Sequence, residues 1–167
     1  MLTEYEGEIF NAGKNADSVS IWKYIPIKGF EKHTTRRGIT YYEKVIKMED
    51  VGELFDITFR ALMNDKKFIV KSMNNRKIDV ICDDYEYSKA NGFSEMEHGV
   101  WSKRFPIDAF SEFHLVKSVE NSKQKEVKML SVKEFIDAWR EYVIGVEAWS
   151  TCRDAGIIAN YGKAKID

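Results

Sequence analysis

The sequence is poor in cysteine and in proline, with two of each in 167 residues. Cys82 and Cys152 stand far apart and form no Cys-x-x-Cys motif, so neither a disulfide framework nor a zinc ribbon is predicted. Two free thiols are typical of a protein from a reducing compartment. No Pro- or Ser-rich linker divides the chain, and we expect one domain over residues 1–167 with a loose tail at about 159–167.

Long apolar runs are also missing, and none approaches the roughly 18–20 residues of a membrane span. The first eight residues are acidic, whereas a signal peptide begins with a basic region. These two absences predict a cytoplasmic protein. The preference for Ile and Lys over Leu and Arg suggests an AT-rich coding sequence, so the expected compartment is the cytoplasm of a bacterium or of a phage-infected host cell.

The sequence also has no excess of positive or of negative charge. Lys and Arg number 26 against 27 Asp and Glu, which gives a formal net charge of -1. A protein that binds nucleic acid over its whole surface is usually basic, so this balance excludes that class while leaving room for local charged patches. Phosphate-binding glycine loops, HExxH, GxSxG and EF-hand motifs are absent as well, which removes the enzymes most easily identified by motif.

What is present is 44% hydrophobic residues, 13% of the chain being aromatic, which is enough for an independent core. Apolar residues at 3-4 spacing, after Asp50 and Glu53 as a capping pair, predict a central helix at about 50–63. The capping box of Ser131 and Glu134 opens a second apolar stripe and predicts a long C-terminal helix at about 131–150. Between and before the helices, β-branched and aromatic runs predict strands at 3–10, 18–27, 39–48, 67–72, 77–82, 100–107, 112–119 and 126–130. The runs at 3–10 and 126–130 give the weakest strand signal. The expected fold class is α+β, an antiparallel sheet of roughly five to seven strands packed by the two helices.

Several carboxylates lie within or shortly after the strand expected at 77–82. Asp79 and Asp83 share a face of that strand, and Glu95, Glu97 and His98 follow within a polar stretch. Converging oxygen ligands suit Mg²⁺ or Mn²⁺, and His98 with Glu95 or Glu97 suits acid–base chemistry. One hypothesis is accordingly a nuclease or nucleotide hydrolase; the alternative is a solvated acidic turn, for which no metal and no cofactor is expected.

Cations and rings alternate over residues 22–47. Trp22, Tyr41 and Tyr42 lie close in sequence to Arg36 and Arg37, a composition that suits single-stranded nucleic acid because rings stack on bases and cations meet phosphates. Glu31 and Glu43 dilute the positive charge. A second hypothesis is therefore a single-stranded nucleic-acid binder; the alternative is a polar loop between two strands.

Trp101 and Trp149 belong to a surplus of rings beyond what the core of a small domain needs. Because Trp, Tyr and Arg dominate the energetics of protein interfaces, exposed rings favour a protein partner. The function we expect first is a small non-enzymatic protein that binds a macromolecule, of the immunity, inhibitor or phage host-takeover type. Its binding residues would come from Trp22, Arg36, Arg37, Tyr41, Tyr42, Trp101 and Trp149.

Overall fold

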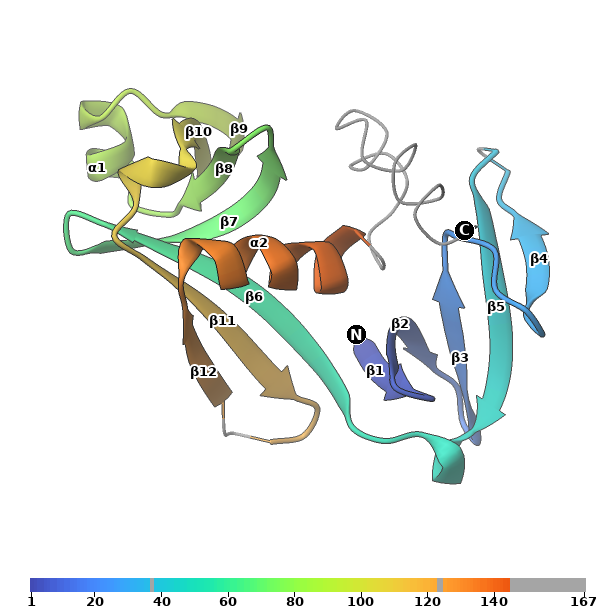
Figure 1. Ribbon diagram of the computed structural model, residues 1–167. Helices are drawn as coiled ribbons and strands as arrows, with labels where there is room; N and C mark the ends of the chain where they lie inside the picture. Colours follow the sequence, from blue (N-terminus) through green and yellow to red (C-terminus); the bar gives the residue numbers. More distant parts are fainter. Residues whose placement is uncertain (37, 123–124, 145–167) are drawn as a thin grey trace. The chain divides into compact units, whose positions relative to one another are not determined.

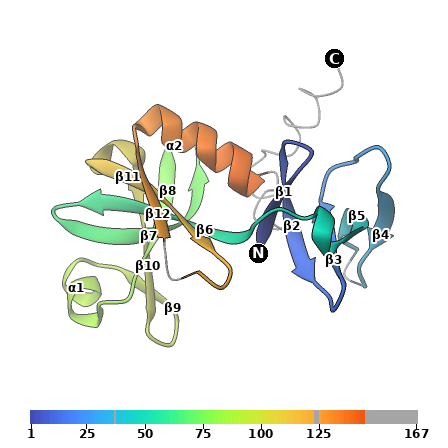
Figure 2. The ribbon, with the colours of Figure 1, turned by 90° about the horizontal axis from the view of Figure 1, so that it is seen from below.

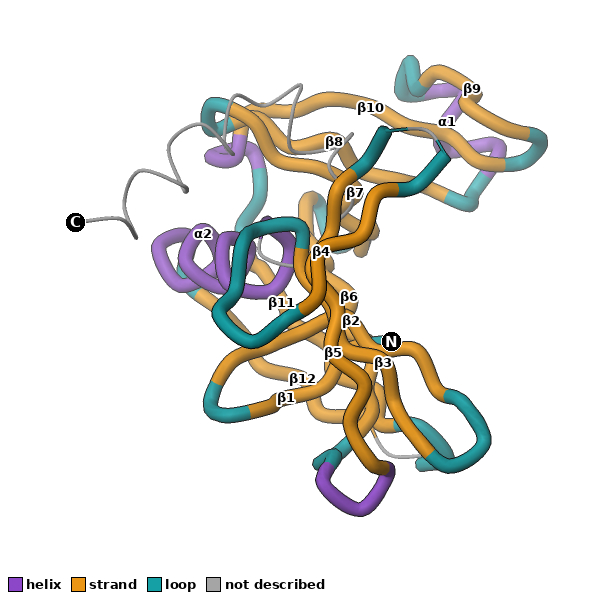
Figure 3. The backbone as a smooth tube through the Cα atoms, turned by 90° about the vertical axis from the view of Figure 1, so that its right-hand side faces the viewer, coloured by secondary structure: helices purple, strands orange, loops and turns teal. Residues whose placement is uncertain are grey.

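Strands make up most of the computed structural model, which describes residues 1–36, 38–122 and 125–144. Figure 3 shows how far strand predominates over helix along the chain. Within the described residues there are twelve strands (Figure 1): β1 Leu2–Tyr5, β2 Glu8–Lys14, β3 Ser18–Lys23, β4 Glu31–Thr34, β5 Thr40–Lys47, β6 Leu54–Met63, β7 Lys66–Asn74, β8 Lys77–Cys82, β9 Ser94–Glu97, β10 Val100–Pro106, β11 Glu112–Val119 and β12 Lys125–Leu130. The helical elements are short: η1 Met48–Asp50, α1 Tyr85–Ala90, η2 Ile107–Ala109, α2 Val132–Trp139 and the π-helical turn η3 Arg140–Ile144.

The predicted α+β class with five to seven strands is wrong, because the fold is mainly antiparallel β and the expected central helix at about 50–63 does not form. That segment is η1 followed by strand β6. From Phe55 to Ala61 apolar and polar residues alternate strictly, and Phe55, Phe59 and Ala61 are buried while Asp56 is exposed. Period-two burial of this kind is the property of a strand.

The C-terminal helix begins where its capping box predicts. The backbone N–H of Ser131 donates to Glu134 Oε2 over 2.8 Å, and the N–H of Glu134 donates to Ser131 Oγ over 3.3 Å. The first hydrogen bond holds the pKa of Glu134 below its usual value. The α-helix ends at Trp139 and a π-helical turn continues to Ile144. The predicted end near residue 150 and the tail at 159–167 lie outside the described residues.

Three two-residue turns join neighbouring strands with positive φ at both positions. They are Glu6-Gly7 between β1 and β2, Asn64-Asp65 between β6 and β7, and Asn75-Arg76 between β7 and β8. Two positive φ angles define the type I′ turn, whose twist matches that of antiparallel strands. These turns fix the register of the strands on either side.

The described chain forms two compact units. Unit 1 comprises Met1–Ile57, Lys117–Lys125 and the described residues from Asp137. Its strands are ordered β4-β5-β3-β2-β1, and the first residues of β6 pair with β1. One face of this sheet carries a core of Phe10, Ala12, Val19, Ile21, Ile46 and Leu54.

Unit 2 comprises Thr58–Val116 and Glu126–Ile136. Here β6, β7, β8, β10 and β9 are successive neighbours, and β11 pairs with β6 and with β12. Figure 2 shows α1 beside the β9–β10 hairpin. Rings in contact form much of its interior: Phe59, Phe68, Phe93, Phe105, Phe110, Phe113 and Phe135.

In the part of the chain that the structure describes, no helix has the length and apolarity needed to cross a membrane.

Candidate binding surfaces

The first candidate is one face of the unit 1 sheet, here called the β3–β5 face and made of Trp22, Glu31, His33, Tyr41, Glu43 and Val45. The register brings these side chains together, since Trp22 is opposite Glu43 and His33 is opposite Tyr41. The His33 and Tyr41 rings stack with centroids 5.3 Å apart. Val45 leaves 62% of its surface exposed, a high value for an aliphatic residue in a strand.

Trp22 is half-buried because its ring lies against the neighbouring strand β2. A Cβ atom placed on Gly13 would stand 3.2 Å from Cζ3 of Trp22. That separation is too tight for a relaxed contact, so the glycine provides the space in which the indole rests. The absence of a side chain at Gly13 therefore allows Trp22 to lie in this position.

The β3–β5 face carries negative charge. His33 Nε2 lies 3.6 Å from a Glu43 carboxylate oxygen and 3.8 Å from one of Glu31. Arg36 is exposed in the turn between β4 and β5, and Arg37 lies outside the described residues. Two carboxylates thus flank the rings, with one described arginine at the tip of the hairpin.

Lys23 and Lys44 point to the opposite side of the sheet, whereas Lys47 lies on the same side as Val45, with Nζ 3.2 Å from a Glu49 carboxylate oxygen. Lys23, opposite Tyr42 in the register, is buried with Nζ 2.6 Å from a Glu8 carboxylate oxygen. Lys44 Nζ donates to the Tyr5 hydroxyl over 3.0 Å, and this hydrogen bond raises the pKa of Lys44. Tyr41 and Tyr42, neighbours in sequence, are therefore on different faces, and part of the basic stretch is engaged inside unit 1.

Asp79, the first of the predicted metal ligands, is held by its neighbours in unit 2. Its Oδ1 accepts from Arg104 Nε over 2.7 Å, and its Oδ2 accepts from Arg104 Nη2 over 2.7 Å and from Ser72 Oγ over 2.6 Å. The bonds from Arg104, and then that from Ser72, lower the pKa of Asp79. Both carboxylate oxygens are thus already satisfied by protein donors.

The other members of the acidic cluster do not converge on Asp79. Asp83 is exposed beyond the end of β8, and Glu97 and His98 are exposed at the β9–β10 turn. Glu95 accepts the backbone N–H of Gly99 over 3.2 Å. Over residues 1–36, 38–122 and 125–144, no group of three or more His, Cys, Asp or Glu side chains is placed to hold a metal ion.

Asp84, next to Asp83, has a local structural role instead. It is the N-cap of α1 and accepts the backbone N–H of Tyr87 over 3.0 Å. Lys66 Nζ lies 2.5 Å from Asp84 Oδ2, and this hydrogen bond lowers the pKa of Asp84. Asp84 thus begins a helix that the sequence did not predict.

Trp101 packs inside unit 2 more than on its surface. It is half-buried in β10 opposite Cys82, and its ring meets that of Tyr85 edge to face with centroids 5.6 Å apart. Tyr85 is the more exposed partner, at 50%. Trp149, the other tryptophan named as a binding residue, lies outside the described residues.

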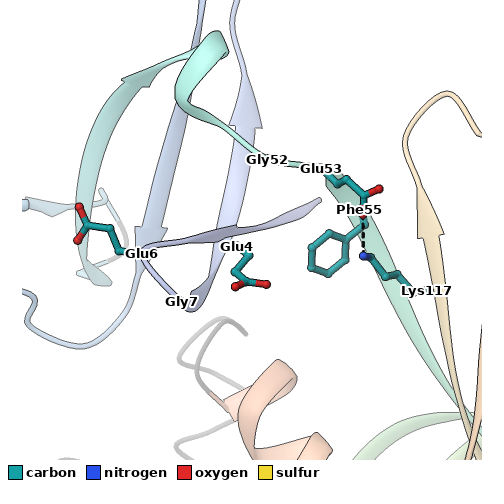
Figure 4. A pocket seen from close by; sticks show the side chains of 7 residues that line it. All are labelled: Glu4, Glu6, Gly7, Gly52, Glu53, Phe55 and Lys117. Atoms are coloured by element: carbon teal, nitrogen blue, oxygen red, sulfur yellow. Dashed lines mark hydrogen bonds and ion pairs between the residues drawn. The ribbon is translucent and has the colours of Figure 1, made fainter.

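A pocket of about 330 Å³ in unit 1 was not predicted from the sequence. Lys117 lines this pocket, and its Nζ atom lies 2.8 Å from a Glu53 carboxylate oxygen and 4.6 Å from the centre of the Phe55 ring. Figure 4 shows these three side chains together and Glu6 pointing away from them. Lys117 and Glu53, two of the charged residues that line the pocket, are thus paired with each other. The lining residues are Glu4, Glu6, Gly7, Gly52, Glu53, Phe55 and Lys117.

Comparison with known proteins yields a family. No curated protein and no solved structure matches the chain. A family model matches residues 1–130, which is most of the chain and includes the β3–β5 face and the Asp79–Arg104 pair. The chain belongs to the family described as uncharacterised conserved protein UCP033725.

Proposed function

We propose that this chain is a non-enzymatic binding protein that recognises a protein partner through the β3–β5 face. The observation that carries the proposal is the placement of Trp22, Tyr41 and Val45 on one sheet face, with Val45 62% exposed. Tyr and Trp supply large contact area at low entropic cost and dominate interface hot spots. Immunity proteins, inhibitors and phage host-takeover factors act in this way, by binding one macromolecule.

The charge of the same face favours a basic protein surface as the partner. Glu31 and Glu43 lie beside the rings, and both are within 4 Å of His33. A phosphate backbone would be repelled by these carboxylates, whereas a partner carrying Lys or Arg would be steered toward them. Residues 22–47 therefore support protein binding better than binding of single-stranded nucleic acid.

The hydrolase alternative receives less support from the geometry. Asp79 has both oxygens engaged by Arg104 and Ser72. An assay of nuclease and nucleotide hydrolysis with and without Mg²⁺ addresses this alternative directly. Activity in the wild type that is lost in Asp83→Ala or His98→Ala would overturn the binding proposal.

The proposal is tested by capture of the partner from native cells with three forms of the protein. These are the wild type, the double variant Trp22→Ala/Tyr41→Ala, and the control Tyr85→Ala, which removes an exposed ring from another surface. We expect one stoichiometric protein with the wild type and with Tyr85→Ala, and its loss with the double variant. Recovery of that protein by the double variant, or recovery of none by the wild type, would contradict the proposal.

A further inference from the structure

Strand β12 is an edge that exposes apolar side chains. Within the described residues it pairs with β11 alone, and Figure 1 shows the two as adjacent strands of one hairpin. Five of its six residues are exposed, among them Val127 at 62% and Met129 at 65%. An edge with unpaired backbone groups and apolar side chains is a template for another strand.

The side chains of β12 alternate in character. Val127 and Met129 point to one side of the strand, and Glu126 and Lys128 point to the other. The two charges are of opposite sign and stand at equal distances in sequence on either side of Val127. A strand with this pattern is self-complementary when it meets a reversed copy of itself.

We propose that β12 pairs antiparallel with β12 of a second copy of this chain, with the two Val127 residues opposite each other on a two-fold axis. In this register Glu126 faces Lys128 of the second copy, and Lys128 faces Glu126 of the second copy. On the other side, Met129 of each copy packs along the aliphatic stem of Lys125 of the other. Opposite charges and apolar pairs directly across a strand pair are stabilising.

A second exposed edge offers a contrast. Strand β9 pairs only with β10 among the described strands, and all four of its residues are exposed. Self-pairing centred on Met96 would place Glu95 opposite Glu97 of a second copy and set like charges against each other. Charge complementarity therefore favours self-pairing of β12 over self-pairing of β9.

The size of the contact sets its strength. Two strands of six residues bury less than the roughly 1,200 Å² of a stable interface, so the dimer is weak and forms in the micromolar to millimolar range. The interface is isologous, with the same patch on both copies, so it closes as a dimer and does not extend into fibres.

The test is sedimentation velocity over a concentration series reaching the millimolar range. We expect the wild type to pass from monomer to dimer, and Glu126→Lys or Lys128→Glu to weaken dimerisation by about tenfold or more, since two attractive pairs become repulsive. The charge-swapped double variant Glu126→Lys/Lys128→Glu restores the pairs and should dimerise like the wild type. Glu97→Lys on β9 is the matched control and should leave the dimer unchanged.

A mixture of the two single variants tests the register itself. One variant presents two lysines and the other two glutamates, so neither pairs with itself but each complements the other, and we expect a heterodimer. Circular dichroism and thermal melting verify that all variants are folded. A wild type that stays monomeric throughout, a folded single variant that dimerises unchanged, or a mixture that does not associate would each overturn the proposal.

Discussion

The hydrogen bonds of the Asp79 carboxylate determine its role in the fold. On sequence it is a candidate metal ligand, because it shares a strand face with Asp83. In the fold the Arg104 guanidinium meets both of its oxygens and Ser72 donates to one of them. The pair joins β8 to β10, where Asp79 and Arg104 are opposite in the register. Asp79 is therefore a cross-strand support of the unit 2 sheet.

The pH dependence of stability follows from the same contacts. Because the pKa of Asp79 is lower in the folded than in the unfolded chain, its ionised form stabilises the fold above about pH 4, and that contribution is lost as the pH falls through the folded pKa. Asp79→Asn should lower the free energy of unfolding near neutral pH by about 1 kcal/mol, a value kept small by the exposure of Arg104. Urea unfolding from pH 7 to pH 2 should show the difference from wild type shrinking below about pH 4. A difference that stays constant to pH 2 would contradict this assignment.

The β3–β5 face could be predicted only in part at the level of single residues. The composition of residues 22–47 indicates rings and cations, and Trp22 and Tyr41 do lie on one face. Tyr42 and Lys23 lie on the other, because alternate residues of a strand point to opposite sides. The position of Gly13 beneath Trp22 depends on the pairing of β2 with β3, which no local pattern gives.

At the scale of elements, β6 shows why a helical spacing can mislead. Leu54, Phe55, Thr58 and Leu62 fall at intervals of three and four, which favours a helix. The alternation over residues 55–61 favours a strand, and the pairing of β6 with β1, β7 and β11 decides between the two. The Glu53 carboxylate, which fits a helical cap on sequence, instead meets Lys117.

The effects of two substitutions in β6 on the free energy of unfolding distinguish a strand from a helix in this segment. Phe59 is 3% exposed and packs against the Phe135 ring, so Phe59→Ala should lower the free energy of unfolding by about 3–5 kcal/mol. Thr58, on the opposite side of the strand, is half-buried, and Thr58→Ala should change it by less than about 1 kcal/mol. Urea denaturation of both variants measures the two values. The reverse order would fit the helical face that includes Thr58 and would contradict the strand.

Elements with a local signature were predicted well. Strands β8 and β11 have the predicted bounds, Lys77–Cys82 and Glu112–Val119, and α2 follows its capping box at Ser131. The short helix α1 and strand β9 were not predicted, because six and four polar-rich residues give no clear period. Which strands lie at an edge, as β12 does among the described strands, depends on the whole sheet and is not contained in any one segment.

In the whole molecule, several of the opposite charges that sum to a net charge of -1 are paired with each other. Lys23 with Glu8, Lys66 with Asp84 and Arg104 with Asp79 join residues 15 to 25 positions apart. What these pairs leave on the surfaces differs in sign from place to place, as the carboxylates of the β3–β5 face show. Net charge therefore excludes a uniformly basic protein but does not describe any one surface.

The division into two units could not be predicted from the sequence. Residues 117–125 belong to unit 1, although they follow and precede segments of unit 2. Each unit has an interior of its own, aliphatic side chains and Phe10 in unit 1 and contacting phenylalanine rings in unit 2. No linker marks a boundary, and the expectation of a single domain stays a prediction.

Calorimetric titration of the purified partner measures whether the chain binds a protein through the β3–β5 face. The wild type, Trp22→Ala and the control Tyr85→Ala are compared at equal ionic strength. We expect Trp22→Ala to weaken binding by at least about tenfold, as truncation of an interface tryptophan does, and Tyr85→Ala to bind like the wild type. Equal affinity of Trp22→Ala and the wild type for that partner would show that the β3–β5 face is not the binding surface.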